Sequence, residues 1–275
     1  MNRFLSFLFV ITSHVTLAAN ITDTTQNFPA NPIKKPGWIL TKHDEFTDTV
    51  LNTNLWIPYY FRQRAALDND VKAQYTFKEG CIILQLFKSG TSSLQTFEHT
   101  NLLMTKIKNI DKKVNFSQQY GYFEIRAKTQ AGAGHNSAFW LIGLQKDTTQ
   151  TGEIDVFEQP GKFGNNFFIS SFHPWKDPGT KKYLLKGKDF QIKYSSDRDL
   201  SATFNIYAVE WTPTLLKYYF NNRLIYVVPY SPRYKMGVLL SLYQSSGENW
   251  MGSLDKTISY PKTFVIDYFR AYKKR

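Results

Sequence analysis

Short stretches of alternating or continuous apolar residues recur along the chain, and Gly, Pro, Asn, Asp and Ser separate them. These stretches are rich in β-branched and aromatic side chains, which predicts β-strands, because strand side chains point alternately to two faces. No long stretch keeps the period of an amphipathic helix, about 3.6 residues. The predicted strands cover residues 75–87, 120–129, 137–144, 153–158, 167–173, 204–211, 216–220, 224–228, 236–243 and 264–272.

This order of strands predicts an all-β fold in which two antiparallel sheets pack as a sandwich of the jelly-roll, concanavalin A-like type. The chain has 275 residues, of which 42% are hydrophobic, so one domain can bury a large core. The Asn221-Asn222 pair between two strands is typical of a tight hairpin turn. No internal repeat or interdomain linker stands out, and we expect a single catalytic domain over residues 37–275.

The first 19 residues have the pattern of a secretory signal peptide. Arg3 precedes an apolar run over residues 4–11, and small residues follow at Ala18 and Ala19. An uncleaved N-terminal anchor is the alternative, and no later run is long enough to cross a bilayer. We therefore expect a secreted protein, extracellular or periplasmic, without stable membrane insertion. Residues 20–36, rich in Thr, Asn, Pro and Lys, are expected to form a flexible lead-in.

Charge and cysteine content narrow the range of partners. Cys81 is the only cysteine, so no internal disulfide is possible, and its apolar neighbours indicate a buried strand residue. The net charge of +12 favours contact with polyanions such as sulfated glycans, although it is more typical of a solubilising surface. Export and a cluster of acids argue against nucleic acid as a partner. We expect a monomer.

The densest group of acids lies in Gly152-Glu153-Ile154-Asp155-Val156-Phe157-Glu158. Strand alternation places Glu153 and Asp155 on one face, where residue 157 should be next. The third acid is instead at position 158, so it either points into the apolar layer or returns to the acidic face through a β-bulge. The bulge is the less costly arrangement, because an unpaired buried carboxylate costs several kcal/mol.

Three carboxylates on one strand face would repel one another and raise the pKa of at least one of them. Cleavage of a glycosidic bond uses such a pair, since one carboxylate must be ionised to attack and the other must hold a proton. With the bulge, Glu153 and Glu158 could bring their carboxyl groups to the roughly 5–5.5 Å of a retaining enzyme. A solvent-facing acidic strand without catalytic role remains the alternative.

The sequence Glu-Ile-Asp-Val-Phe-Glu resembles the active-site signature of glycoside hydrolase family 16, in the bulged form of its laminarinase, agarase and carrageenase branches. The resemblance implies that Glu153 is the nucleophile, Asp155 assists it, and Glu158 is the acid/base. It extends in the family's order from about residue 38 to 272. The matching segments are Trp38 to Phe46, Leu55-Trp56, Tyr120 to Lys128, Ala138 to Leu141, Tyr207 to Pro213 and Phe264 to Tyr272.

Four further residues are candidates for substrate binding. His173 lies about one strand after the acids, so a neighbouring strand could place it beside a carboxylate. Trp140, Trp175 and Trp250 lie in or near segments expected to surround the acids, and aromatic rings offer platforms for the flat faces of sugars. Each of the four could equally be a packing residue.

We therefore predict a retaining endo-glycosidase that hydrolyses a polysaccharide, with β-1,3- or mixed-linkage glucan as the favoured substrate. Agar- or carrageenan-type galactans, transglycosylation and a non-catalytic glycan-binding role are the alternatives. No cofactor is expected, because the chain has no paired metal-ligand spacing and no phosphate-binding glycine loop. A structural calcium ion, as found in relatives, stays open.

Overall fold

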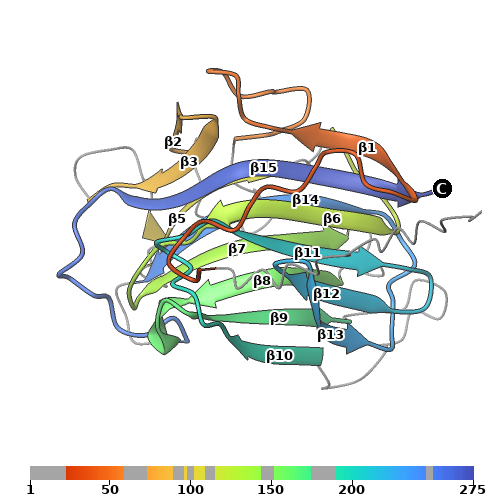
Figure 1. Ribbon diagram of the computed structural model, residues 1–275. Coiled ribbons are helices and arrows are strands. Elements are labelled where there is room, and N and C mark those ends of the chain that lie inside the picture. Colours follow the sequence, from red (N-terminus) through yellow and green to blue (C-terminus); the bar gives the residue numbers. More distant parts are fainter. Residues whose placement is uncertain are drawn as a thin grey trace, which may run out of the picture.

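The computed structural model describes residues 23–58, 73–88, 96–97, 102–108, 115–143, 152–174, 190–245 and 250–275. The described strands form two sheets in which every strand pair is antiparallel, and the sheets stack face to face (Figure 1). This arrangement confirms the predicted all-β sandwich. Within the described part of the chain, no helix has both the length and the apolar character needed to cross a membrane.

Sheet A has the strand order β13-β12-β11-β6-β15-β3-β2, and β1 also pairs with β15. The long strand β15 pairs with β6 along one side and with β3 and then β1 along the other. The strands are β1 (Trp38–Asp44), β2 (Tyr75–Lys78), β3 (Cys81–Leu86), β6 (Gly121–Lys128), β11 (Asn205–Trp211), β12 (Leu216–Phe220), β13 (Arg223–Val228) and β15 (Lys262–Lys274).

Sheet B has the order β10-β9-β8-β7-β14-β5-β4 and contains the strand with the three acids. That strand, β8, lies between β7 and β9, so its side chains have neighbours on both sides. The strands are β4 (Thr96–Phe97), β5 (Leu102–Lys108), β7 (His135–Gly143), β8 (Glu153–Pro160), β9 (Phe167–His173), β10 (Phe190–Ser195) and β14 (Met236–Ser245); a short 3-10 helix, η2 (Gly161–Phe163), follows β8.

The core lies between the two sheets and is rich in aromatic rings. Phe157 of β8 stacks on Tyr207 of β11 with ring centroids 3.9 Å apart, which joins sheet B to sheet A. In β6, Phe123 and Ile125 point into this core, whereas Glu124 between them points to the outer face. Alternation along each strand thus leaves both sheets with an outward face that can carry polar groups.

Most strand predictions are confirmed, with two kinds of difference. Residues 75–87 form two strands rather than one, because Glu79 and Gly80 adopt positive φ angles of 53° and 72° and reverse the chain. Strands β4, β5 and β10 were not predicted. β10 is the described edge of sheet B, and its residues alternate between partly exposed and exposed. Phe190, Ile192 and Tyr194 alternate with polar residues, so the strand pattern is present in the sequence and the prediction overlooked it. Cys81 is buried, as predicted, and burial raises the pKa of its thiol to about 11.

The segment over residues 23–36, which we call the arm, crosses the outer face of sheet A (Figure 1). The Phe28 amide donates to the Phe204 carbonyl at 2.8 Å, and Arg126 donates to the Phe28 carbonyl at 2.8 Å. Asn31 donates to Glu124 at 3.0 Å. The sequence led us to expect a flexible lead-in over residues 20–36, and in the structure backbone groups of Phe28 and Asn31 are hydrogen-bonded to the sheet beneath.

Candidate active site

A β-bulge in the middle of β8 shapes the candidate site. Asp155 pairs with Trp140 of β7 and Phe157 pairs with Phe139, so Val156 has no partner of its own on that strand. On the other side, Asp155 pairs with Ser171 and Glu158 with Ile169, so two residues of β8 face Ser170 alone. The predicted bulge is confirmed.

The bulge sorts the side chains of β8 between the two faces. Ile154, Val156 and Phe157 all belong to the buried core, although Val156 and Phe157 are consecutive. The extra residue restores the alternation for Glu158, which therefore shares the outward face with Glu153 and Asp155. We call this surface, formed by the three acids and their strand neighbours, the acidic face.

Ser170 stabilises the bulge from the neighbouring strand β9. Its hydroxyl donates a hydrogen bond to the Val156 carbonyl at 2.7 Å, and both residues are buried. A bulge disrupts the regular ladder, and a buried carbonyl without a partner would cost about 1–3 kcal/mol. Ser170 thus supplies the hydrogen-bond donor that the Val156 carbonyl needs at the bulge.

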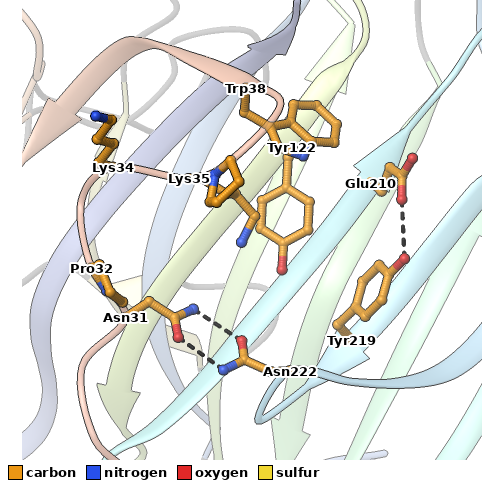
Figure 2. Close-up of a pocket in the computed structure, with 10 residues that line it drawn as sticks. Asn31, Pro32, Lys34, Lys35, Trp38, Tyr122, Glu210, Tyr219 and Asn222 are labelled. Atoms are coloured by element: carbon orange, nitrogen blue, oxygen red, sulfur yellow. Dashed lines mark hydrogen bonds between the residues drawn. The ribbon is translucent and has the colours of Figure 1, made fainter.

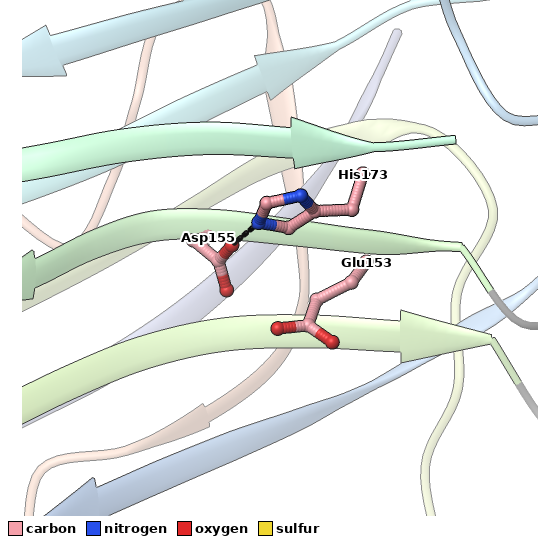
Figure 3. A group of neighbouring side chains, drawn as sticks. All are labelled: Glu153, Asp155 and His173. Carbon is pink, nitrogen blue, oxygen red and sulfur yellow. Dashed lines mark ion pairs between the residues drawn. The ribbon is translucent and has the colours of Figure 1, made fainter. Parts of the chain in front are cut away.

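Asp155 lies at the centre of the site, and its side chain contacts those of His173 and Glu153 (Figure 3). His173 pairs with Glu153 across the sheet, and its Nε2 lies 3.1 Å from Oδ2 of Asp155. Burial and the negative charge of Glu158 raise the pKa of Asp155, while hydrogen bonds to His173 and Glu153 lower it in part. Asp155 can therefore hold or share a proton close to Glu153, and it fixes the position of that carboxylate.

Glu158 has the properties of a general acid. Burial and the negative charge of Glu153 raise its pKa to about 7, although a hydrogen bond from Asn136 and the nearby His173 act in the opposite direction. The Asn136 amide donates to Oε1 of Glu158 at 3.1 Å. Glu158 remains partly exposed, so its proton is accessible from outside. A carboxyl that is about half protonated at neutral pH beside an acidic neighbour suits proton transfer in both directions.

The candidate substrate-binding residues have different positions. His173 lies on the acidic face as expected, and it contacts an acid directly. Trp140 lies beside Asp155 on β7, is partly exposed, and donates from Nε1 to the Ser241 hydroxyl at 3.0 Å. Trp250 is 47% exposed and lies near the start of β7, because the next residue, Met251, accepts a hydrogen bond from Gly134. Trp175 lies outside the described residues.

Sequence reasoning missed Asn136, Ser170 and Ser241. Asn136 and Trp140 are four residues apart on β7, so the alternation of a strand would have placed both on one face. Ser170 and Ser241 carried no local signal, because their roles depend on which strands become neighbours of β8 and β7.

A cation could also contact part of this cluster. One donor atom each from Glu153, Asp155 and His173 lies within 4.8 Å of the other two. His173 and Asp155 already contact each other at 3.1 Å, and the third acid, Glu158, is bonded to Asn136. Because these side chains already contact one another, the geometry favours proton transfer over cation binding as the chemistry of the cluster. The calcium ion left open from the sequence stays a prediction.

The chain is similar to known proteins of one family. The family model described as glycosyl hydrolases family 16 matches residues 85–262. A Beta-glucanase from Rhodothermus marinus is 27% identical over 178 residues, which cover 57% of this chain and 58% of the relative. A Keratan-sulfate endo-1,4-beta-galactosidase from Sphingobacterium multivorum is 26% identical over 174 residues, which cover 58% of this chain and 38% of the relative.

Among solved structures, a GlcNAcα1-4Gal releasing endo-β-galactosidase from Clostridium perfringens superimposes with a TM-score of 0.78 at 31% identity. The match covers 90% of this chain and 66% of that structure's chain, so the present chain spans less than two thirds of these relatives. The family model covers more than half of the chain and includes all three acids of the bulged strand. The chain belongs to glycosyl hydrolases family 16.

Proposed function

We propose that the protein is a retaining endo-β-glycosidase in which Glu153 is the nucleophile and Glu158 the acid/base. The observation that supports this most is the bulge, which brings Glu153, Asp155 and Glu158 to one face. The pKa of Glu158, raised to about 7 beside Glu153, divides the roles, because one carboxyl must carry a proton while the other is ionised.

In the first step, Glu158 donates its proton to the glycosidic oxygen while a carboxylate oxygen of Glu153 attacks the anomeric carbon. The bond from that carbon to the leaving oxygen breaks, and a glycosyl ester forms on Glu153. Asp155 orients Glu153 through its hydrogen bond, and His173 holds Asp155 from the other side.

In the second step, Glu158 is ionised and removes a proton from a water molecule. The resulting hydroxide attacks the anomeric carbon, and the ester bond to Glu153 breaks. Two inversions at one carbon retain its configuration, and Glu158 ends protonated as it began. Capture of the ester by a second sugar in place of water would give transglycosylation.

We propose a β-galactosidic bond within a glycan as the substrate. The sequence alone favoured a β-1,3- or mixed-linkage glucan. The endo-β-galactosidase from Clostridium perfringens, however, combines 31% identity with 90% coverage of this chain, and the relative from Sphingobacterium multivorum is also named as a galactosidase. A β-glucan is the second candidate, because the glucanase from Rhodothermus marinus has a similar identity of 27%. We also propose export, supported by the apolar run over residues 4–11.

The test is release of reducing ends from a panel of glycans by wild type and Glu153→Gln. The panel is keratan sulfate, agarose, carrageenan, laminarin, mixed-linkage glucan and an aryl β-glycoside of GlcNAcα1-4Gal. We expect wild type to cleave at least one galactose-containing member and Glu153→Gln to cleave none. Glu79→Gln is the matched control, because the Glu79 side chain is 81% exposed on a turn of sheet A.

Proton NMR of the first products decides the stereochemistry. We expect the β-anomer to appear before mutarotation, because the mechanism passes through an ester on Glu153. Turnover by Glu153→Gln at the wild-type rate, or release of the α-anomer, would contradict the proposed nucleophile. Binding without turnover by wild type would indicate a glycan-binding protein, and cleavage of laminarin alone would select the glucan.

A further inference from the structure

A pocket of about 370 Å³ lies on the outer face of sheet A, between the arm and strands β6, β11 and β12 (Figure 2). Tyr122 and Glu210 project into it, whereas the strand neighbours Phe123 and Val209 point into the core. The acids of β8 lie on the outward face of the other sheet. The pocket and the acidic face are therefore on opposite sides of the sandwich, and a short glycan could not occupy both.

The wall that the arm contributes is held in place by polar contacts. Asn31 and Asn222 exchange hydrogen bonds at 2.9 and 2.8 Å between their amide groups, which closes one end of the pocket. Arg270 donates to the Asn31 carbonyl at 2.7 Å, and Tyr272 donates to the Ile33 carbonyl at 3.0 Å. Pro32 and Pro36 restrict φ in the same wall. The arm is therefore already ordered before a ligand binds, so binding would not cost the conformational entropy of ordering it.

Three aromatic rings lie along the pocket. Tyr122 forms the floor, with its ring centroid 5.5 Å from that of Trp38 and 5.8 Å from that of Tyr219. The Lys35 ammonium group covers the Tyr122 ring at 4.0 Å, so this ring is almost completely buried. Trp38 and Tyr219 are partly exposed at the two sides. The Lys274 ammonium group lies 4.7 Å from the Trp38 ring centroid, so part of that ring is already covered, and Tyr219 offers a further aromatic surface to a ligand.

The polar groups of the pocket match the hydroxyl groups of a sugar. Glu210 accepts a hydrogen bond from Tyr219 at 3.0 Å and lies 3.5 Å from Lys217, which leaves acceptor capacity on its carboxylate. Lys34 is exposed and forms no ion pair with the part of the chain that the structure describes. Lys34 and Glu210 carry opposite charges, and the third charged residue of the lining, Lys35, lies 3.7 Å from the buried carboxylate of Glu124, so the lining has no strong preference for an anion or a cation.

We propose that this pocket is a second glycan-binding site, which holds an uncharged pyranose unit of a polysaccharide outside the catalytic face. The sugar ring would lie against Tyr219 and Trp38, with its hydroxyl groups donating to Glu210 and accepting from Lys34. Such a site would keep the protein on a polymer between cleavage events. The inference rests on the proposed function only for the class of ligand, since the pocket shares no residue with the acidic face.

The test is NMR of tryptophan side chains in the Glu153→Gln protein, titrated with agarohexaose and with laminarihexaose. Both probes are uncharged. The indole N–H signals of Trp38 and Trp140 report on the pocket and on the acidic face, and each is assigned by its Trp→Phe variant. We expect the Trp38 signal to shift saturably with at least one probe and with a midpoint different from that of Trp140.

Two variants of the pocket and one control variant test the proposal. Tyr219→Ala should weaken the Trp38 response about tenfold, because a stacking surface is lost, and should leave the Trp140 response unchanged. Lys34→Ala should also weaken it, and this exposed residue can be changed without disturbing the core. Val227→Ser, an equally accessible change on the neighbouring strand β13, is the matched control and should alter neither response.

A Trp38 signal that neither probe moves would overturn the proposal, as would a shift that Lys34→Ala and Tyr219→Ala leave intact. A shift that dextran sulfate reproduces and that 0.5 M salt (roughly a 4 Å screening length) abolishes would also overturn it, because that behaviour belongs to adsorption of polyanions. A Trp38 response without any response of Trp140, together with no turnover of the glycan panel by wild type, would leave this site standing and count against the proposed catalytic function.

Discussion

Two carboxylates with the same burial lie on opposite faces of the sandwich and have opposite surroundings. Glu124 on sheet A and Asp155 on sheet B are 0% and 1% exposed. The carboxylate of Glu124 lies 3.7 Å from both Arg270 and Lys35 and accepts a hydrogen bond from Asn31. Asp155 instead has two further acids, Glu153 and Glu158, as electrostatic neighbours and His173 as its only described ion-pair partner.

The comparison shows that burial of an acid does not by itself indicate catalysis. Around Glu124, cations and an amide neutralise the charge, and the result is a rigid contact between the arm and the sheet. Around Asp155, like charges are held together, and the pKa of both Asp155 and Glu158 rises. The sign of the charge on the neighbouring groups therefore distinguishes a structural cluster of charges from a cluster that can exchange protons.

The largest effect is expected from Glu158→Gln, which removes the proton donor but keeps the shape of the side chain. We expect kcat to fall by about 10²–10⁴-fold, the usual contribution of a general acid/base. The free energy of unfolding should not fall at neutral pH, because the substitution also removes repulsion from Glu153. Steady-state kinetics and urea unfolding measure the two quantities.

A control for this first prediction uses Glu158→Ala with an aryl glycoside that has a good leaving group. Azide needs no general base to attack the ester, so it should restore part of the turnover. Absence of rescue, or a large loss of stability in Glu158→Gln, would indicate that Glu158 has a structural role and is not the acid/base.

Glu124→Gln should have the opposite profile. The change leaves the buried Arg270 and the half-buried Lys35 without one carboxylate, and removal of one partner from a buried ion pair costs about 3 kcal/mol or more. Arg270 keeps its two contacts with Glu45, at 2.9 and 2.7 Å, which limits the loss. Urea unfolding should show the decrease, while kcat per folded molecule stays at the wild-type value. If Glu124→Gln lowered kcat without lowering stability, Glu124 would not have the purely structural role that distinguishes it from the acids of β8.

The most gradual effect, and the smallest over any one pH unit, is expected in the pH dependence of stability. The pKa of Glu158 rises from 4.5 to about 7 on folding, so the folded protein binds its proton more tightly than the unfolded chain. This contribution to stability is complete below pH 4.5 and is lost as the pH rises to about 7, at no more than about 1.4 kcal/mol per pH unit. Unfolding of wild type and Glu158→Gln from pH 4 to 8 should differ by this slope. If the free energies of unfolding of the two proteins changed in parallel with pH, the pKa of Glu158 would not be raised by folding.

Local spacing was sufficient to predict the acids and the bulge. In Glu153-Ile154-Asp155-Val156-Phe157-Glu158, only an extra residue puts all three acids on one face and all three apolar residues in the core. The alternation of single strands likewise predicted the sandwich. Both conclusions depend on residues that are neighbours in the sequence, where the period of a strand is a reliable guide.

Contacts between distant segments could not be predicted in this way. The arm contains no apolar run, and it packs because Asn31, Phe28 and Ile33 meet partners about 90 to 240 residues away. Asn136 gains its role only when β7 lies beside β8. The pocket on sheet A combines the arm with β6, β11 and β12, so no single segment carries its pattern.

The position of β15 has a consequence for the synthesis of the protein. This strand lies inside sheet A, between β6 on one side and β3 and β1 on the other, although it is the last of the strands that the structure describes. Strands that leave the ribosome early must wait for residue 274 before they gain their partner, with exposed edges and an uncovered core. Sheet A therefore cannot be completed before β15 is available, and we expect the earlier strands to expose edges and apolar surface until it joins them.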